Sequence, residues 1–169
     1  MREIVRGRIC LLGVLFCLLL GGCAPREGDY FAPFAVAFAA DVQGSWNNVE
    51  FGAQVCATPL DAAGAREMTV TFYAPSGLCG TVLTSRADGS LSLCAGEISL
   101  PLSAYAAEGY AALLALFPTA GEVQTLSREG ENTRVAGAGF SLLFSPDGVP
   151  LELSAGATHV RVIAWEQRK

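Results

Sequence analysis

The sequence has little of what enzymes ordinarily use. It holds one histidine, His159, in 169 residues, and only 16% of its residues are charged. It contains no G-x-S-x-G, no H-E-x-x-H and no glycine-rich phosphate loop ending in Lys-Ser or Lys-Thr, which mark common catalytic and nucleotide-binding sites. A nucleophile, base and acid can be imagined in Ser141, His159 and Asp147, but serines on strands are usually the solvated half of an alternating pattern. We therefore predict that the protein is not an enzyme.

Metal ligands and positive charge are also scarce. No two of the six cysteines have the C-x2–4-C spacing typical of zinc sites, and there is only one histidine to join them. The chain has 11 basic and 16 acidic side chains. Because an acidic chain is repelled by phosphate backbones, we do not expect nucleic acid as a partner. We expect no metal and no other cofactor.

An apolar run near the N-terminus is too short to span a membrane. Residues 9–22 follow three arginines and one glutamate, whereas a spanning helix needs about 20 apolar residues. A basic segment followed by a short apolar run and small residues describes a secretory signal. The run ends in Leu20-Gly21-Gly22-Cys23, which resembles the lipobox of bacterial lipoproteins. That resemblance implies cleavage before Cys23 and diacylation of its thiol.

The lipobox divides the chain into three parts. Residues 1–22 are the lipoprotein signal peptide, residues 23–33 a lipidated tether with two prolines, and residues 34–169 a single β-rich domain. Removing the signal takes away three basic and one acidic side chain and leaves a formal charge of −7, so surface charge cannot hold the protein on anionic lipid, whereas two acyl chains can. We expect a protein of the bacterial cell envelope, anchored to a membrane through Cys23 and facing the periplasm or the cell exterior.

Three cysteines lie beyond the lipobox, namely Cys56, Cys79 and Cys94. Exported proteins can form disulfides, and Cys79 and Cys94 flank an expected hairpin. A turn centred on residues 88–89 would, however, place Cys94 opposite residues 81–83 and not opposite Cys79. One disulfide with one free thiol and three free thiols are both open at this point.

Most of the mature chain has the alternating pattern of antiparallel strands. Met68, Val70 and Phe72 alternate with two threonines and a tyrosine, and Leu91 and Leu93 alternate with serines. We count about nine or ten short strands. A single sheet of this size with one apolar face must curl, close or be covered. The expected fold is therefore mainly β (α+β), with one curved antiparallel sheet.

Two turn signals separate these strands. Asp88-Gly89 lies between two alternating runs and is a strong hairpin signal. Residues 145–150, SPDGVP, have proline at the first corner of a turn and a glycine that tolerates positive φ. Trp46 lies in the turn-like stretch GSWNN, and Trp165 lies close to the C-terminus. We expect both tryptophans to pack at the rim of the domain.

One helix is expected between the strands, over residues 103–117. Ser103 suits an N-cap, and Pro118 stops the helix. Apolar side chains surround its axis, and Glu108 is its only charge. Because a helix that is apolar nearly all round must be buried on more than one side, we expect it to cover the apolar face of the sheet.

Two stretches carry a resemblance to a known family. TVTFYAPSGLCGTVL resembles the strand, proline corner and glycine turn of the Lol-type (LolA/LolB-like) lipoprotein carrier and receptor superfamily, and FSLLFSPDGVPLELS is similar to its late hairpin. The resemblance covers residues 34–165. It implies a half-open β-barrel whose concave apolar face is covered by helices. Two features depart from that family: the proline-containing tether replaces the helix before the first strand, and no basic residue of the helix or strand core stands out for ligand handling.

The sequence leaves two functions open. In FAVAFAA, large residues alternate with alanines, so both faces of a strand are apolar and could line a hydrophobic pocket. Such a pocket would bind an acyl chain, a lipid or the lipid moiety of another lipoprotein, without catalysis. Alternatively, the same residues form a packed core, and the protein is a structural docking module in an envelope complex. The candidate cavity residues are Phe34, Val36, Phe38, Val70, Phe72, Leu91, Leu93, Leu113, Phe117, Phe140 and Leu142.

The lipobox generates the first prediction. Replacing Cys23 by alanine should abolish incorporation of radiolabelled palmitate and leave the precursor uncut, because the acylated thiol is the cleavage site. The Cys56→Ala variant should still be labelled and processed. Equal palmitate labelling of Cys23→Ala and the unchanged chain would show that Cys23 is not the anchor.

Overall fold

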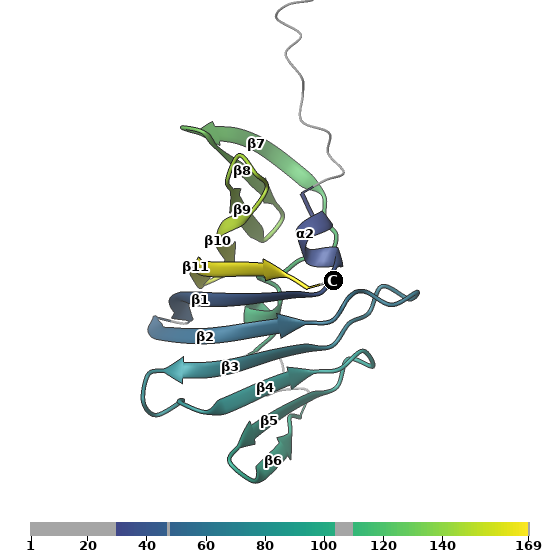
Figure 1. Cartoon of the computed structure of the whole chain (residues 1–169), viewed down its shortest axis with the longest axis vertical. Helices are drawn as coiled ribbons and strands as arrows, with labels where there is room; N and C mark the ends of the chain where they lie inside the picture. Colours follow the sequence, from purple (N-terminus) through teal and green to yellow (C-terminus); the bar gives the residue numbers. More distant parts are fainter. Residues whose placement is uncertain (1–29, 47, 104–109, 169) are drawn as a thin grey trace, which may run out of the picture.

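One antiparallel sheet dominates the computed structural model, which describes residues 30–46, 48–103 and 110–168. Figure 1 shows its strands in sequence colours. In these residues the elements are α2 (Ala32–Ala35), β1 (Phe38–Trp46), β2 (Val49–Ala57), β3 (Met68–Ala74), β4 (Thr81–Ser85), β5 (Leu91–Ala95), β6 (Ile98–Pro101), β7 (Val123–Glu129), β8 (Asn132–Gly137), β9 (Phe140–Phe144), β10 (Pro150–Ala155) and β11 (Thr158–Gln167).

The first and last strands meet in the middle of the sheet. The order is β6-β5-β4-β3-β2-β1-β11-β10-β9-β8-β7, so one meander runs outward from β1 and a second returns from the far edge to β11. β6 and β7 are the two edges, at opposite ends in Figure 1, and the sheet is not closed. The expectation of a mainly β fold with a single antiparallel sheet is confirmed, with eleven strands among the described residues in place of nine or ten.

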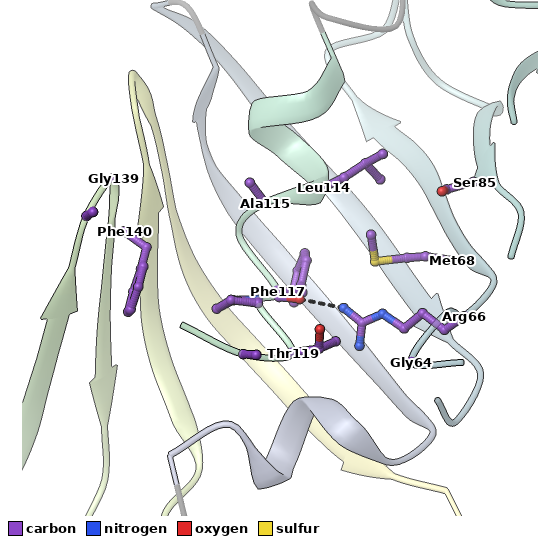
Figure 2. A pocket seen from close by; sticks show the side chains of 13 residues that line it. Gly64, Arg66, Met68, Ser85, Leu114, Ala115, Phe117, Thr119, Gly139 and Phe140 are labelled. Carbon is purple, nitrogen blue, oxygen red and sulfur yellow. Dashed lines mark hydrogen bonds between the residues drawn. The ribbon is translucent and has the colours of Figure 1, made fainter. Parts of the chain in front are cut away.

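The sheet bends along its length. In Figure 1, β7 to β9 run at a steep angle to β1 to β5. Figure 2 shows two short helical segments, α2 and the turn around Leu114, over the same face of the strands. We call this the covered face. The aromatic core packs against this covered face.

The expected helix over 103–117 is described only from residue 110. Residues 110–114 are helical, and the Ala115 N–H donates to the carbonyl of Ala111 at 2.8 Å. The Phe117 N–H then donates to Leu114 at 3.3 Å, which is the tighter i→i−3 pattern of a helix end. The helix thus ends before 117, because Pro118 disfavours helical geometry in the residue before it. The N-cap and first turns expected at 103–109 lie largely outside the described residues.

The described part of the cover comes from two separate segments. In the ranges that the structure describes, the helical segments are short, and none has the length and apolar content needed to cross a membrane. Two short segments, from before β1 and before β7, share the covering that one helix was expected to provide. The tether region also contributes, since Tyr30 and Phe31 pack against the core. The boundary placed at residue 34 remains a prediction.

The alternation expected in FAVAFAA is wrong for its first half. Residues 32–35 form α2, with Pro33 in the first helical turn, where a missing N–H has no cost. Phe34 therefore enters the core from a helix, with 0% of its side chain exposed, whereas Val36 ends that helix and is 41% exposed. Phe38 is buried as the first residue of β1. Val36 is consequently not a cavity residue.

An aromatic cluster forms the centre of the core. Phe34 meets Phe38, Phe117 and Trp165 edge to face, with ring centroids 6.2, 6.3 and 5.6 Å away. Trp165 is stacked on Phe38 at 4.5 Å. Trp165 is partly buried and packs against the core, because the register of β1 with β11 carries it over the covered face. Trp46 is partly buried against Tyr110, at 4.9 Å.

Local patterns are reproduced in most strands but not in β5. Met68, Val70 and Phe72 are buried in β3 as the alternation predicts. In β5, however, Ser92 is 6% exposed, while Leu91 and Leu93 are only half-buried. Ser92 and Leu93 both lie opposite residues of β4 and β6, whereas Leu91 pairs with β4 alone. The inside and outside of β5 are therefore less distinct than its sequence suggests.

Both turn predictions are confirmed. Gly89 has φ of 80°, and the Arg86 N–H donates to the Ser90 carbonyl at 2.9 Å to close the β4–β5 hairpin. Gly148 has φ of 77° and donates to Ser145 at 3.0 Å. Positive φ suits glycine, which has no Cβ.

The three cysteines beyond the lipobox are free in the structure. Cys94 pairs with Val82 in the β4–β5 register, as the turn position predicted. It donates to the Ser99 hydroxyl at 3.3 Å. This arrangement corresponds to the alternative of three free thiols.

The packing of α2 generates the second prediction. Truncating Phe34 to alanine should lower the free energy of unfolding by about 3–5 kcal/mol, because a fully buried ring leaves a cavity among its aromatic neighbours. Val36→Ala, two residues away and exposed, should have little effect. Urea unfolding followed by circular dichroism measures both. A similar small loss in the two variants would contradict the helical entry of Phe34 into the core.

Candidate ligand pocket on the covered face

An open pocket of about 460 Å³ lies beside the aromatic core. Its walls come from parts of the chain that are far apart in sequence: the β2–β3 connection, the paired ends of β3 and β4, the segment after the helical turn, and the β8–β9 turn (Figure 2). The lining residues are Gly64, Arg66, Met68, Ser85, Leu114, Ala115, Phe117, Pro118, Thr119, Ala120, Ala138, Gly139 and Phe140. The pocket therefore joins the two meanders of the sheet.

Arg66 is the single charged residue of this lining. Its guanidinium donates to the carbonyl of Phe34 at 2.6 Å and to the carbonyl of Phe117 at 2.5 Å. Its central carbon lies 5.4 Å from the centre of the Phe38 ring, within cation–π range. Figure 2 shows the side chain reaching from the β2–β3 connection toward Phe117. Arg66 thus links the two covering segments to the sheet.

A tight loop positions Arg66. The Asp61 carboxylate accepts hydrogen bonds from the N–H groups of Ala63 and Ala65, both at 2.8 Å. At the base of the loop, the Thr58 N–H donates to the Glu67 carbonyl at 2.9 Å, and the Glu67 N–H donates to the Thr58 hydroxyl at 2.9 Å. These bonds fix the backbone on both sides of the arginine, so its long side chain is directed under α2.

The environment of Arg66 is poor in compensating charge. Burial lowers the pKa of the Arg66 guanidinium from its usual value, since desolvation disfavours the charged form. Across the described residues, both salt bridges are made by another arginine, Arg134, with Glu129 and Glu152. Arg66 is therefore held by neutral carbonyl oxygens and an aromatic face, and no carboxylate of the described residues lies within ion-pair distance of its guanidinium.

The opposite wall of the pocket is apolar. Phe140, at the start of β9, packs edge to face on Phe31 with centroids 5.9 Å apart. A side chain at Gly137 or Gly121 would collide with its ring, because an added Cβ would lie 2.3 and 2.9 Å from Phe140 carbon atoms. These two glycines leave the space that the ring occupies. The pocket thus has a cationic end and an apolar end.

The structure distributes the predicted cavity residues between core and pocket. Phe117 and Phe140 line the pocket. Leu91 and Leu93 are half-buried, Val36 is exposed, and Cys23 lies outside the described residues. The remaining predicted residues, Phe34, Phe38, Val70, Phe72, Leu113 and Leu142, are buried in the core.

Arg66 is the main residue that the sequence reasoning missed. The search for a basic ligand-handling group was confined to the helix and the strand interiors, whereas Arg66 lies two residues before β3. One signal was available: an arginine, followed by Glu67, between a turn-like AAGA and the apolar strand MTVTF. The hydrogen bonds to Phe34 and Phe117 have no sequence signal, because these residues are separated from Arg66 by 32 and 51 positions along the chain.

The imagined nucleophile, base and acid are not brought together as a triad. The His159 ring contacts the Ser154 hydroxyl, with Nδ1 2.8 Å from Oγ. Ser141 instead accepts a hydrogen bond from Arg134 at 3.2 Å. Asp147 belongs to the β9–β10 turn, beyond the far end of β9 from Ser141. Among the described residues, no group of three or more His, Cys, Asp and Glu side chains is arranged to hold a metal.

Comparisons with known proteins identify the fold. An uncharacterized conserved protein from Thermus thermophilus matches 83% of this chain and 85% of its own at 16% identity, with a TM-score of 0.50. MucB matches 88% of this chain at 15% identity, also with a TM-score of 0.50. This chain shares its fold with both proteins. This chain spans 60% of the MucB chain. At these identities the similarity establishes the fold alone.

A third solved structure is more distant. The LolA superfamily protein NE2245 from Nitrosomonas europaea matches 86% of this chain and 95% of its own at 7% identity, with a TM-score of 0.39. A similarity of that size supports no statement about this chain. No protein-family model and no curated protein matches the sequence.

The contacts of Arg66 generate the third prediction. Arg66→Ala should lower the free energy of unfolding by about 2–4 kcal/mol, because two charge-assisted hydrogen bonds and the contact with Phe38 are lost together. Arg128→Ala removes the same charge from the exposed edge strand β7 and should leave stability unchanged. Chemical denaturation of the two variants tests this. If they were equally stable, Arg66 would not be linking the covering segments to the sheet.

Proposed function

We propose that this protein is a non-catalytic lipoprotein of the bacterial envelope that binds an apolar ligand. The ligand would be an acyl chain, a lipid or the lipid moiety of another lipoprotein, and Cys23 would anchor the protein to its membrane. The observation that carries the proposal is the open pocket on the covered face, lined from both meanders of the sheet. The resemblance of two sequence stretches to the Lol-type lipoprotein carrier and receptor superfamily supports the same proposal.

The size and lining of the pocket suit such a ligand. Small-molecule sites occupy about 300–1,000 Å³, and this pocket has about 460 Å³. Each chain methylene transferred from water would contribute about 0.8 kcal/mol. Leu114 is half-buried and lines the pocket, at the end of a helix of which the structure describes little more than one turn.

A second function is favoured by a different observation. Much of the covered face is filled by a close-packed core that includes Phe34, Phe38 and Phe117. At the other end of the sheet, Ile98 and Leu100 are exposed on the edge strand β6. These features suit a docking module of an envelope complex. The two functions differ in residues 110–120, which should exchange their amide hydrogens quickly in a movable cover and slowly in a core.

Native mass spectrometry of residues 24–169, followed by organic extraction, tests the first function and gives the fourth prediction. A co-purifying acyl-chain species is expected. Leu114→Asp should abolish it, because a carboxylate in the pocket opposes burial of methylenes. Leu100→Asp, which adds the same charge on β6, should retain it. Circular dichroism verifies that each protein is folded.

Two results would refute ligand binding. One is a folded chain of unliganded mass that also takes up no fatty acid or phospholipid from vesicles. The other is equal retention of lipid by Leu114→Asp and Leu100→Asp, which would place the lipid outside the pocket. In the first case the docking function would become the working hypothesis.

A further inference from the structure

The structural contacts of Arg66 do not use all of its hydrogen-bond donors and do not require its positive charge. Capping two carbonyl groups uses two of the five N–H donors of a guanidinium. Among the described residues, no carboxylate forms an ion pair with the Arg66 guanidinium. Arg134 differs in this respect, since Glu129 and Glu152 pair with it and the Ser141 hydroxyl accepts a further bond. Arg66 is thus a cation in a pocket that only neutral described groups hold.

The surroundings of Arg66 would strengthen its attraction for an anion. None of the thirteen lining residues is acidic, although the chain as a whole has a net charge of −5. Partial burial removes water from the guanidinium, and charge interactions are stronger where water is excluded. The hydroxyl-bearing residues Ser85 and Thr119 also line the pocket. The cationic end can thus receive a small oxyanion.

The remainder of the pocket determines what else the ligand carries. Figure 2 shows Arg66 and Phe140 on opposite sides, with Phe117 between them and Leu114 above Arg66. These three apolar side chains and Met68 would contact a hydrocarbon chain lying between the two ends. A neutral hydrocarbon would leave the guanidinium without an anionic partner. A free anion would leave the apolar wall of the pocket exposed to water.

We infer that the ligand is a single-chain anionic amphiphile, with its carboxylate or phosphate bound at Arg66 and its acyl chain running toward Phe140. This inference rests on the proposed ligand-binding function and specifies the chemical class of ligand. A guanidinium can hold either oxyanion through two parallel hydrogen bonds. The carboxylate of a fatty acid and the phosphate of a lysophospholipid therefore share the recognised chemistry.

Photo-crosslinking on the full-length protein, reconstituted in phosphatidylcholine vesicles, tests the inference. Three probes carry the same diazirine on the same sixteen-carbon chain: hexadecanoic acid, hexadecanol and a lysophosphatidic acid. The buffer is alkaline enough to ionise the carboxyl group. Labelling of peptides that contain residues 64–68 and 114–120 is measured by mass spectrometry.

Hexadecanoic acid should label these peptides at least about tenfold more than hexadecanol, because a charge-assisted hydrogen bond raises the affinity by about a factor of ten or more. Arg66→Met should abolish the preference, so that the ratio of labelling by the acid to labelling by the alcohol falls to about one. Arg128→Met, the matched control, should retain the preference. Since each comparison is a ratio within the same vesicles, unequal partition of the probes into the bilayer cancels between variants.

The other probes identify the oxyanion. Labelling by lysophosphatidic acid alone would assign a phosphate headgroup, and labelling by the fatty acid alone would assign a carboxylate. Inorganic phosphate should not compete, because it lacks the methylenes that the apolar wall buries. If inorganic phosphate displaced the probes at equal concentration, the site would bind anions only and the amphiphile would be excluded.

Failure of the inference and failure of the proposed function give different results. Equal labelling by acid and alcohol in the unchanged protein would refute recognition of an anionic head but preserve the apolar pocket. No labelling of the pocket peptides by any probe would refute ligand binding itself. If Arg66→Met does not fold, Arg66→Lys tests the inference instead. This variant should keep part of the preference for the acid over the alcohol, since lysine supplies the positive charge without the paired N–H donors of a guanidinium.

Discussion

The packing of Phe34 is the constraint on which the rest of the structure depends. Its ring touches aromatic side chains from β1, from β9, from β11 and from the segment after the helical turn. No other described side chain meets as many aromatic rings. Because a bent open sheet must cover its apolar face, these contacts fix α2 and Phe117 over the point where the two meanders join. The pocket lies immediately beside that junction.

This way of covering the sheet has an electrostatic consequence. Short helical segments have carbonyl groups that no later N–H of the segment can satisfy. The carbonyls of Phe34 and Phe117 are satisfied by Arg66, which brings a cation under an aromatic cover. The same arginine then faces the pocket. The structural requirement for a donor and the proposed recognition of an anionic head thus depend on one side chain, and a ligand that paired with it would also alter the links between cover and sheet.

Predictions from the sequence were successful where the determining interactions are local. The hairpin at Asp88-Gly89, the turn at Gly148 and the register of Cys94 follow from turn chemistry over a few residues. The alternation in β3 follows from one uniformly covered face. The strand expected from residue 34 was wrong because Pro33 favours a helical turn there. The predicted burial of Leu91 and Leu93 in β5 was overstated. The alternation in the sequence does not show which strands the covering segments reach.

The sequence by itself determined the class of fold, the antiparallel turns, the short apolar run before Cys23 and the shortage of catalytic and metal-binding residues. Only the tertiary structure decided that β1 pairs with β11, and that pairing places Trp165 against the buried rings of Phe34 and Phe38. It also decided that Arg66, Leu114, Phe117 and Phe140 share one pocket. The physical reason is separation along the chain: propensity and periodicity act over a few neighbours, whereas a pocket is made by segments tens of residues apart whose contacts leave no periodic trace in the sequence.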